Sequence, residues 1–272
     1  MDLGLEGVHV LVTGASGGIG LETVKLFLKL GAIVTAHYNT NATTLPPLVT
    51  QFGDKRVRAL QAELSDESSV AALFAAAEAW SGPVQVLIVN HGYYPPDDAP
   101  VAQMSLAQWN NTIAANLTSA FLVVRAYMRG LERATEVQKE KANVVIIGST
   151  AGKYGEFGHA DYSAVKSGMM YGLTMTLKNE IVKVAPKGRV NVCAPGWVKT
   201  PMAAQALANP SVIYRALATM PLKKVAIPED VANQVVVLAS TVLSGHVSGQ
   251  VVMVEGGMEG RLLNMPAEVT SY

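Results

Sequence analysis

The chain has 272 residues. Half of them are apolar, 15% are charged, and 21 Lys and Arg residues balance 21 Asp and Glu residues. This length and apolar content predict one large α/β domain with a full hydrophobic core and exclude a disordered protein. The formal net charge of zero argues against a nucleic-acid-binding protein, because phosphate backbones attract basic surfaces. Cys193 is the single cysteine, which excludes an internal disulfide framework and a cysteine-rich metal site and favours a reducing compartment.

The apolar runs of the chain are short, and none approaches the ~20 residues that a membrane helix needs. The first residues include Asp2 and Glu6, and they show neither the basic region nor the apolar region of a signal peptide. The sequence therefore predicts a cytoplasmic protein that carries no targeting segment and binds no membrane.

Seven short runs rich in β-branched residues are almost continuously apolar, which is typical of strands buried on both faces. These runs are 8–13, 33–36, 57–60, 84–90, 144–149, 190–194 and 251–254. Stretches with helical spacing or with many Ala and Leu residues separate them, at 19–30, 68–80, 106–134, 162–184 and 228–239. Because strand and helix alternate repeatedly, we expect a single α/β domain with a doubly wound, seven-stranded parallel sheet.

The segments between these elements carry weaker patterns. The predicted loops and surface segments are 39–47, 93–100, the charged stretch 132–141 at the solvated end of a long helix, and the flap 203–220. We expect the domain to occupy residues 1–260. Residues 261–272, which include Pro266, show no clear pattern and are predicted to form a C-terminal tail.

A glycine-rich segment follows the first predicted strand and opens the first predicted helix. Residues 13–20 read Thr-Gly-Ala-Ser-Gly-Gly-Ile-Gly. Gly14 permits a sharp turn, Gly18 lets the backbone approach a pyrophosphate, and Gly20 lets the helix pack closely on the strand. A structural turn can have the same composition. The position between strand and helix nevertheless favours a dinucleotide-binding loop, because free N–H groups and the helix dipole attract an anion there.

The end of the second predicted strand indicates which dinucleotide binds, because a carboxylate there would bond the adenosine ribose. Residues 37–41 read His-Tyr-Asn-Thr-Asn. They contain no carboxylate that would repel a 2′-phosphate and several groups that can hydrogen-bond one, although they also contain no arginine. We therefore predict a preference for NADP(H) over NAD(H).

Tyr162 and Lys166 are four residues apart in a predicted helix, so their side chains lie on one face. A nearby ammonium stabilises a phenolate and lowers the pKa of tyrosine from about 10, which suits general acid catalysis at neutral pH. The pair follows Ser149 by thirteen residues, and Ser149 ends the fifth predicted strand. Since the carboxyl ends of strands face the ligand crevice of a doubly wound sheet, the three side chains are expected to converge there.

These motifs resemble the short-chain dehydrogenase/reductase family over about residues 5–257. The matching residues are the segment 13–20, Asn90-His91-Gly92 in place of the family's Asn-Ala-Gly, Asn116, Ser149, Tyr162-x-x-x-Lys166 and Pro195-Gly196. The resemblance implies a Rossmann-like fold in which Tyr162 exchanges a proton with the substrate oxygen and Ser149 orients that oxygen. It also implies that Lys166 holds the nicotinamide ribose and tunes Tyr162, while Asn116 holds a water that links Lys166 to solvent.

The resemblance further implies a set of cofactor contacts spread along the chain. The expected contacts are Gly14, Ser16, Gly18, Ile19, Gly20, Tyr38, Asn39, Thr40, Glu63, Leu64, Asn90, His91, Gly92, Asn116, Tyr162, Lys166, Pro195, Gly196, Val198 and Thr200. Glu63 stands where the family usually has an aspartate near the adenine. His91 either bonds a phosphate or the substrate, or is a tolerated replacement of alanine.

The substrate contacts are predicted from position alone. Tyr94, His159 and Trp197 are expected to lie beside Ser149 at the mouth of the pocket, where ordinary wall packing would also suit them. The five histidines show no metal-ligand spacing, so no metal site is expected.

The leading functional prediction is an NADP(H)-dependent oxidoreductase that interconverts a ketone or aldehyde and an alcohol, with a small molecule as its substrate. An epimerase or dehydratase with the same acid/base residues is an alternative, and so is a non-catalytic redox sensor that binds NADP(H). The family resemblance implies a homodimer or homotetramer that associates through the segments 106–134 and 162–184.

Overall fold

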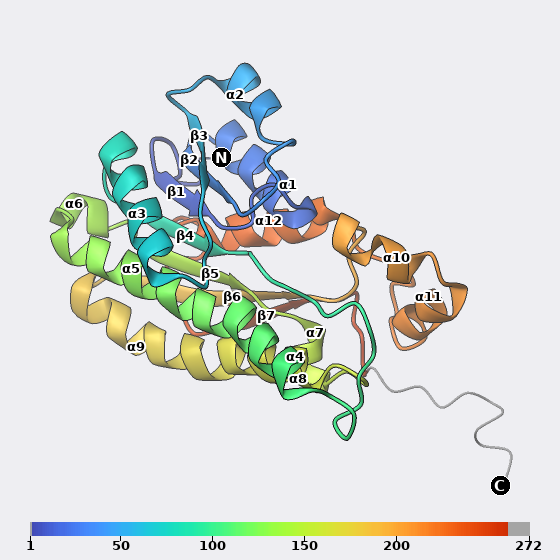
Figure 1. Ribbon diagram of the computed structural model, residues 1–272. Coiled ribbons are helices and arrows are strands. Elements are labelled where there is room, and N and C mark those ends of the chain that lie inside the picture. Colours follow the sequence, from blue (N-terminus) through green and yellow to red (C-terminus); the bar gives the residue numbers. More distant parts are fainter. Residues whose placement is uncertain (1, 261–272) are drawn as a thin grey trace, which may run out of the picture.

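The structure is a computed structural model that describes residues 2–260, so the tail predicted over 261–272 lies outside the described residues (Figure 1). It shows a single-domain α/β fold in which seven parallel strands form one sheet in the order β3-β2-β1-β4-β5-β6-β7. The strands are β1 (His9–Val12), β2 (Ile33–Tyr38), β3 (Val57–Gln61), β4 (Val86–Val89), β5 (Asn143–Ile147), β6 (Arg189–Pro195) and β7 (Val251–Val254). The winding reverses between β1 and β4, which places a crevice at the carboxyl ends of these strands. The predicted fold class is confirmed.

Helices surround the sheet. The α-helices are α1 (Gly18–Lys29), α2 (Pro46–Phe52), α3 (Glu67–Ser81), α4 (Leu106–Thr112), α5 (Ser119–Arg133), α6 (Glu136–Lys139), α7 (Thr150–Tyr154), α8 (Ala160–Ser167), α9 (Thr174–Val184), α10 (Ala204–Leu207), α11 (Pro210–Leu217) and α12 (Pro228–Ala239). Two π-helical stretches, η1 (Ile113–Thr118) and η2 (Gly168–Leu173), and a 3₁₀ turn, η3 (Pro201–Ala203), complete the set.

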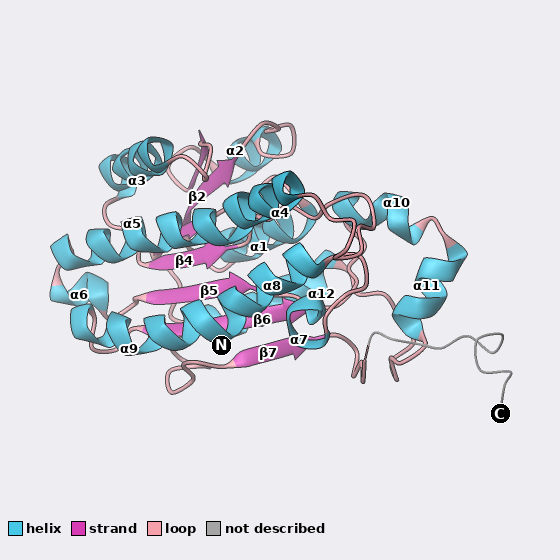
Figure 2. Cartoon of the chain, turned by 60° about the horizontal axis from the view of Figure 1, so that its bottom comes forward, coloured by secondary structure: helices cyan, strands magenta, loops and turns pink. Residues whose placement is uncertain are grey.

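The helices form a layer on each face of the sheet (Figure 2). α3, α5 and α9 cover one face, where Phe74, Tyr127 and Ile181 belong to the hydrophobic core. α1, α2 and α12 cover the other face, where Phe27 and Val235 belong to a second core cluster. Because both faces are buried, the strands are apolar on both sides, which explains their continuous apolar runs in the sequence.

The two long predicted helices follow the expected paths, but each contains a π-helical stretch. The segment 106–134 comprises α4, η1 and α5, and the segment 162–184 runs through α8, η2 and α9. A π-helical turn accommodates an extra residue and is frequent at functional sites. Within η1, the Asn116 side-chain amide donates a hydrogen bond of 2.9 Å to the Thr112 carbonyl oxygen. Helical periodicity does not reveal this local widening.

Two predictions for surface segments need correction. The predicted loop 39–47 ends in the first turn of α2, where Pro46 is compatible with a helix start because its missing N–H would have no partner there. The charged stretch 132–141 is more than the end of a long helix: α5 ends at Arg133, and the stretch continues into α6. α6 starts with a capping box between Thr135 and Gln138. Such short helices depend on their caps, which hydrophobic periodicity does not detect.

The segment 203–220, predicted as a flap, contains α10 and α11. The Asn209 side chain caps α11 by accepting a hydrogen bond of 3.0 Å from the Ser211 amide. These helices are only four and eight residues long, so neither is long enough to show a clear helical periodicity in the sequence.

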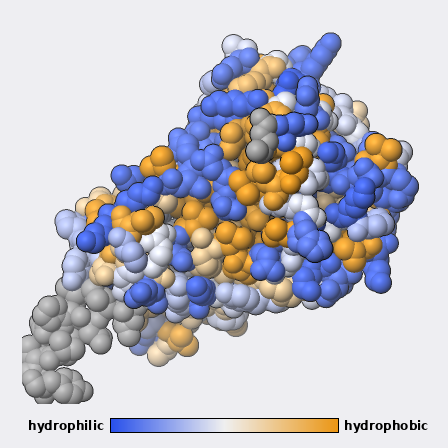
Figure 3. All heavy atoms as spheres, turned by 180° about the vertical axis from the view of Figure 1, so that it is seen from behind, coloured by the Kyte–Doolittle hydropathy of each residue, from blue (hydrophilic) through white to orange (hydrophobic). Residues whose placement is uncertain are grey.

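Apolar side chains also reach the surface. Seen from behind, they gather in the middle of the face and polar side chains surround them (Figure 3). Within residues 2–260, no helix is long and apolar enough to cross a membrane.

Candidate active site

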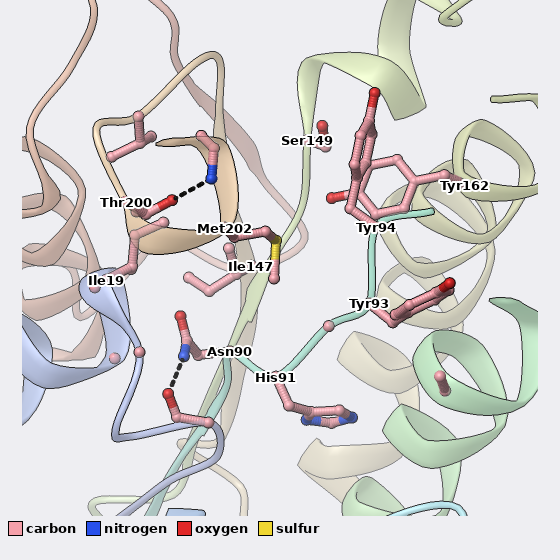
Figure 4. Close-up of a pocket in the computed structure, with 18 of the residues that line it drawn as sticks. Ile19, Asn90, His91, Tyr93, Tyr94, Ile147, Ser149, Tyr162, Thr200 and Met202 are labelled. Carbon is pink, nitrogen blue, oxygen red and sulfur yellow. Dashed lines mark hydrogen bonds between the residues drawn. The ribbon is translucent and has the colours of Figure 1, made fainter. Parts of the chain in front are cut away.

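A cavity of about 770 Å³ opens at the carboxyl ends of the strands. It runs from the loop between β1 and α1 to the start of α8 (Figure 4). Ile19, Asn90 and Thr200 lie at one end, and Ser149, Tyr94 and Tyr162 gather at the other (Figure 4). The crevice predicted from the winding of the sheet is therefore present as a cavity, and most of the predicted site residues line it.

The glycine-rich loop is shaped by backbone requirements at three glycines. Gly14 has a φ of +61°, a conformation that residues with a Cβ rarely adopt. A Cβ on Gly20 would overlap the Gly14 carbonyl oxygen, and a Cβ on Gly18 would lie 2.8 Å from the Thr200 Cγ2. Gly17 to Gly20 form the N-terminal end of α1 without a side-chain cap, so free N–H groups point toward the cavity end. The loop has the shape and the free donors that the predicted pyrophosphate site needs, and that role stays a prediction.

The side chains of His37, in β2, and Asn90, directly after β4, hold this loop. The Nδ1 of His37 accepts a hydrogen bond of 3.1 Å from the Gly14 N–H, and its Nε2 donates one of 3.0 Å to the Ala62 carbonyl oxygen. The Asn90 amide donates bonds of 2.9 and 3.0 Å to the carbonyl oxygens of Thr13 and Gly14. His37 is buried and its pKa is lowered, chiefly by burial, which keeps it neutral and able to accept. The sequence analysis did not assign this role to His37.

The end of the cavity beside β2, where the sequence predicts that the adenosine binds, is polar. Asn39 and Thr40 line it, and the Asn39 amide donates a hydrogen bond of 3.0 Å to the Glu63 carboxylate. The Ser65 backbone N–H and hydroxyl donate to the same carboxylate, which lowers the pKa of Glu63. Leu64 lines the cavity as predicted, but Tyr38 does not and packs against the core instead.

His91 lies beneath the middle of the cavity and ties two elements together. Its Nδ1 lies 2.8 Å from the Thr13 Oγ1 and its Nε2 lies 2.8 Å from the Ser119 Oγ. Burial is the main cause that lowers the pKa of His91 to about 3, with smaller contributions from His37 and Lys166. Both ring nitrogens therefore face hydroxyl partners, so His91 links the residue that follows β1 to α5 while it lines the cavity.

The Lys166 side chain extends from α8, past the Tyr162 ring, to the carboxyl end of β5. Its Nζ donates a hydrogen bond of 2.8 Å to the Ile147 carbonyl oxygen and lies 5.6 Å from the centre of the Tyr162 ring. The side chain is only 3% exposed, and burial lowers the pKa of Lys166 to about 8. The helical spacing predicted from the sequence thus brings the ammonium beside the phenol, with both residues lining the cavity.

Ser149 occupies the position between β5 and α7. Its Oγ accepts a hydrogen bond of 3.1 Å from the Ala151 N–H, which makes Ser149 the N-cap of α7. The cap fixes the oxygen at the carboxyl end of β5, on the cavity wall near Tyr162 (Figure 4).

Asn116 is completely buried in η1 and holds the backbone of Tyr93. Its Oδ1 accepts a bond of 3.0 Å from the Tyr93 N–H and its Nδ2 donates one of 2.9 Å to the Tyr93 carbonyl oxygen. A Cβ on Gly92 would lie 3.1 Å from the Asn116 Oδ1 and 3.7 Å from the Lys166 Nζ. A side chain at position 92 would therefore crowd both groups. Gly92 and Lys166 line the cavity but Asn116 does not, and its role in a proton relay stays a prediction.

The residues after β6 close the floor of the cavity. Pro195 is the last residue of β6, and Gly196, Trp197, Val198 and Thr200 follow it along the cavity wall. The Thr200 hydroxyl caps η3 by accepting a bond of 3.4 Å from the Ala203 N–H.

Comparison with known proteins identifies the family. A family model described as short chain dehydrogenase matches residues 8–211. The chain belongs to this family.

Curated relatives of this short-chain dehydrogenase resemble it over almost its whole length. Nodulation protein G of Rhizobium sp. (strain N33) is 33% identical over 254 residues, covering 93% of this chain and 98% of the relative. A 3-oxoacyl-[acyl-carrier-protein] reductase, FabG, of Vibrio harveyi is 30% identical, with coverages of 94% and 99%. An acetoacetyl-CoA reductase of Acinetobacter sp. (strain RA3849) is 32% identical, with coverages of 91% and 96%.

A solved structure has the same fold. The short-chain dehydrogenase/reductase of Brucella melitensis described as a glucose/ribitol dehydrogenase superposes with a TM-score of 0.83 at 29% identity, covering 95% of this chain and 99% of that one. Similarity to solved members of the family therefore extends beyond the matched motifs to the whole sheet and its helices.

One further residue of this dehydrogenase, Asp161, was missed by the sequence analysis. Asp161 precedes Tyr162 and is completely buried. Its carboxylate accepts hydrogen bonds from the Tyr162 N–H (2.8 Å), the Thr112 hydroxyl (2.7 Å) and the Gln108 amide (3.2 Å). It thereby ties the first turn of α8 to α4. A signal was present in the sequence, since an acidic residue in the first turn of a helix is favourable, but burial was not predictable.

His159, predicted beside the substrate, is placed behind Tyr94 and does not line the cavity. Tyr94 and Trp197 do line it, as predicted. Among residues 2–260, no group of three or more His, Cys, Asp or Glu side chains is arranged to hold a metal ion.

Proposed function

We propose that this short-chain dehydrogenase interconverts a ketone or aldehyde and an alcohol, with Tyr162 as the acid and base and NADP(H) as its coenzyme. The observation that carries the proposal is the position of Tyr162 at one end of the cavity, beside buried Lys166, with the glycine-rich loop at the other end. Relatives named as ketoacyl reductases support a carbonyl substrate, and the family match supports an oxidoreductase.

The chain's own groups suit this reaction. A bound nicotinamide dinucleotide supplies or accepts the hydride. In the reducing direction the Tyr162 hydroxyl gives its proton to the substrate oxygen as negative charge develops there, and Ser149 donates a hydrogen bond to the same oxygen. The Ser149 oxygen is already fixed by the Ala151 N–H, so its hydroxyl hydrogen remains for the substrate.

Lys166 has two roles in this proposal. One of its three N–H hydrogens is bound to the Ile147 carbonyl oxygen, which leaves two for the nicotinamide ribose and for a water held near Asn116. Its positive charge beside Tyr162 stabilises the phenolate that forms when the proton leaves. Because the pKa of Lys166 is lowered to about 8, the proton that refills Tyr162 can pass through it near neutral pH.

The coenzyme preference depends on the adenosine end. Asn39, Thr40 and Asn41 line the cavity after β2 and offer amide and hydroxyl donors to a 2′-phosphate. No carboxylate occupies this stretch, which supports NADP(H), although Glu63 is held 3.0 Å from the Asn39 amide. Calorimetric titration with NADPH and NADH tests the preference: tighter binding of NADPH is expected, and equal or tighter binding of NADH contradicts it.

The catalytic role is tested with Tyr162→Phe. Turnover should fall by orders of magnitude while the affinity for NADPH stays within about threefold, because only the acidic hydrogen is lost. Tyr154→Phe is the matched control, since the Tyr154 hydroxyl bonds the Met258 carbonyl oxygen away from the cavity. Unchanged turnover of Tyr162→Phe would remove Tyr162 from the mechanism. Net oxidation of NADPH separates a reductase from an epimerase or dehydratase, and NADPH binding without turnover of any carbonyl compound indicates a sensor.

We also propose that the chain forms a homodimer or homotetramer in a reducing, cytoplasmic compartment. Leu106, Phe121, Tyr171 and Val182 are exposed apolar side chains on α4, α5, η2 and α9, the helices expected to associate. Light scattering coupled to size exclusion measures the mass, and a monomer at micromolar concentration contradicts this proposal.

A further inference from the structure

The wall of the cavity nearest Tyr162 is a fixed aromatic ring. Tyr94 lies edge-on to Tyr162, with ring centres 5.0 Å apart and an angle of 83° between the planes. The same Tyr94 ring is stacked on His159, with centres 4.3 Å apart and planes only 13° from parallel (Figure 4 shows Tyr94 beside Tyr162). Tyr94 lines the cavity whereas His159 does not, so His159 supports the ring from behind.

His159 is itself anchored. It is 2% exposed, and its Nε2 lies 3.1 Å from the Pro95 carbonyl oxygen in the loop that carries Tyr94. Its Nδ1 lies 3.2 Å from the Phe157 carbonyl oxygen, and the Asp98 carboxylate is 3.6 Å away. A backbone hydrogen bond from Ala99 to Gly158 joins the same two loops. The orientation of the Tyr94 ring is therefore set before any substrate arrives, which reduces the entropic cost of stacking a flat molecule on this wall.

The cavity is poor in positive charge. Among its described lining residues the only Lys or Arg is Lys166, which is buried and bonded to the Ile147 carbonyl oxygen. The cavity lining instead includes Glu156, and the loop that carries Tyr94 also carries the exposed residues Asp97 and Asp98. Away from a helix N-terminus such as that of α1, proteins that bind phosphate groups or carboxylates at a pocket usually supply Arg or Lys side chains there. This end of the cavity is therefore unfavourable for an anionic substrate or carrier.

Taking the proposed carbonyl chemistry as given, we propose that the substrate is an uncharged, planar compound whose carbonyl group is conjugated to an aromatic ring. Tyr94 is the specificity-determining residue, and His159 is the positioning residue that holds it. A thioester on coenzyme A or on an acyl carrier protein, as in the names of the two reductase relatives, is disfavoured because Lys166 is the only Lys or Arg among the described residues that line the cavity. Trp197 and Met202 provide further apolar area for a flat ligand.

Matched pairs of probes test the substrate class in the wild-type enzyme with saturating coenzyme. Acetophenone and cyclohexyl methyl ketone have similar size, but only the first is planar and conjugated. Methyl 4-acetylbenzoate and 4-acetylbenzoate differ in charge. We expect kcat/KM to favour acetophenone over its saturated partner by about tenfold, and the neutral ester over the carboxylate by at least tenfold. Acetoacetyl-CoA should be turned over more poorly than acetophenone. Preference for acetoacetyl-CoA or for 4-acetylbenzoate would overturn the proposal.

Variants assign the preference to Tyr94. Tyr94→Leu should reduce the acetophenone/cyclohexyl methyl ketone ratio to about one, whereas Tyr94→Phe should keep it. Since both ketones use Tyr162 in the same way, any disturbance of Tyr162 by the substitution cancels in the ratio. An unchanged ratio in Tyr94→Leu excludes Tyr94 as the determinant.

A further pair of variants tests His159. His159→Ala should raise the KM for acetophenone several-fold with little change in kcat, and His159→Phe, which can still stack, should restore it. A loss of kcat that His159→Phe does not restore indicates a structural role only and contradicts the proposed positioning.

Binding measurements separate this proposal from the proposed function. If the wild-type enzyme turns over none of the probes, the proposed oxidoreductase activity is contradicted for these compounds, and calorimetry with the coenzyme-loaded protein then decides the specificity. Tighter binding of acetophenone than of cyclohexyl methyl ketone and acetoacetyl-CoA supports the assigned class; the reverse order rejects it. If turnover occurs with the reverse preference, the function stands and the substrate class is wrong.

Discussion

The Lys166 ammonium donates a hydrogen bond of 2.8 Å to the carbonyl oxygen of Ile147, the last residue of β5. One contact thus joins the helix that carries Tyr162 to the central strand that leads to Ser149. The bond takes up one hydrogen of the ammonium and places the charge beneath the Tyr162 ring. The proposed acid Tyr162, its electrostatic partner Lys166 and the proposed orienting hydroxyl of Ser149 are thereby grouped at one strand end.

Lys166 should give the stability of the free protein a distinctive pH dependence. Burial lowers its pKa from 10.5 to about 8, so between these values the unfolded chain holds a proton that the folded protein has released. The unfolded state then binds more protons, and the free energy of unfolding rises with pH by about 1.4 kcal/mol per unit from this group. Urea denaturation from pH 7.5 to 10 measures it. Lys166→Met should abolish this component, whereas Lys183→Met, an exposed change in α9, should keep it.

His91 should make the stability of the folded protein depend on pH in the acidic range. Its pKa is lowered to about 3, so it stays neutral in the folded protein while the unfolded chain takes up a proton below about pH 6.5. This contribution to stability is complete above pH 6.5 and is lost at about 1.4 kcal/mol per unit as the pH falls toward 3. His91→Ala should therefore flatten the decrease measured by urea denaturation between pH 6.5 and 4.5. The exposed residue His246 supplies the control, and an equally flat curve for His246→Ala would contradict the assignment to His91.

His37 should be needed for coenzyme affinity. His37→Leu removes the acceptor of the Gly14 N–H, so the glycine-rich loop loses a bond that fixes it for the pyrophosphate. We expect the Kd for NADPH to rise about tenfold, as loss of one hydrogen bond of roughly 1.4 kcal/mol predicts. His9→Leu is a matched control, because His9 is equally buried but bonds the Gly82 carbonyl oxygen and Thr35 away from the cavity. Calorimetry on both variants decides; equal effects would show only a general loss of stability.

Asp161 should stabilise the start of α8. In Asp161→Asn, an amide group faces the Gln108 amide where a carboxylate oxygen accepted its hydrogen bond, so we expect a loss of about 2 kcal/mol in the free energy of unfolding. Removing the opposing donor in Asp161→Asn/Gln108→Ala should recover part of this loss. A double-mutant cycle by urea denaturation measures the coupling, and strictly additive effects would show that the two amides do not conflict.

Several features of the site follow from the order of residues alone. Tyr162 and Lys166 share a helix face because they are four residues apart, and Gly14 marks a turn because its conformation excludes a Cβ. The seven apolar runs predict the sheet because strands covered on both faces favour apolar side chains at most positions. The short helices α6, α7 and α10 were not predicted, since each spans only four or five residues and shows no full period.

Local pattern therefore determined the fold, the family motifs and the helix that carries Tyr162 and Lys166, because each is encoded by neighbours along the chain. Only the tertiary structure decided that His37 holds the glycine-rich loop, that His91 links Thr13 to α5, and that His159 stands behind Tyr94. These contacts join residues 23 to 78 positions apart, or place one residue behind another on a cavity wall. Hydrogen bonding and ring stacking act over a few ångströms in space, so their partners are fixed by how the strands and helices pack and not by spacing in the sequence.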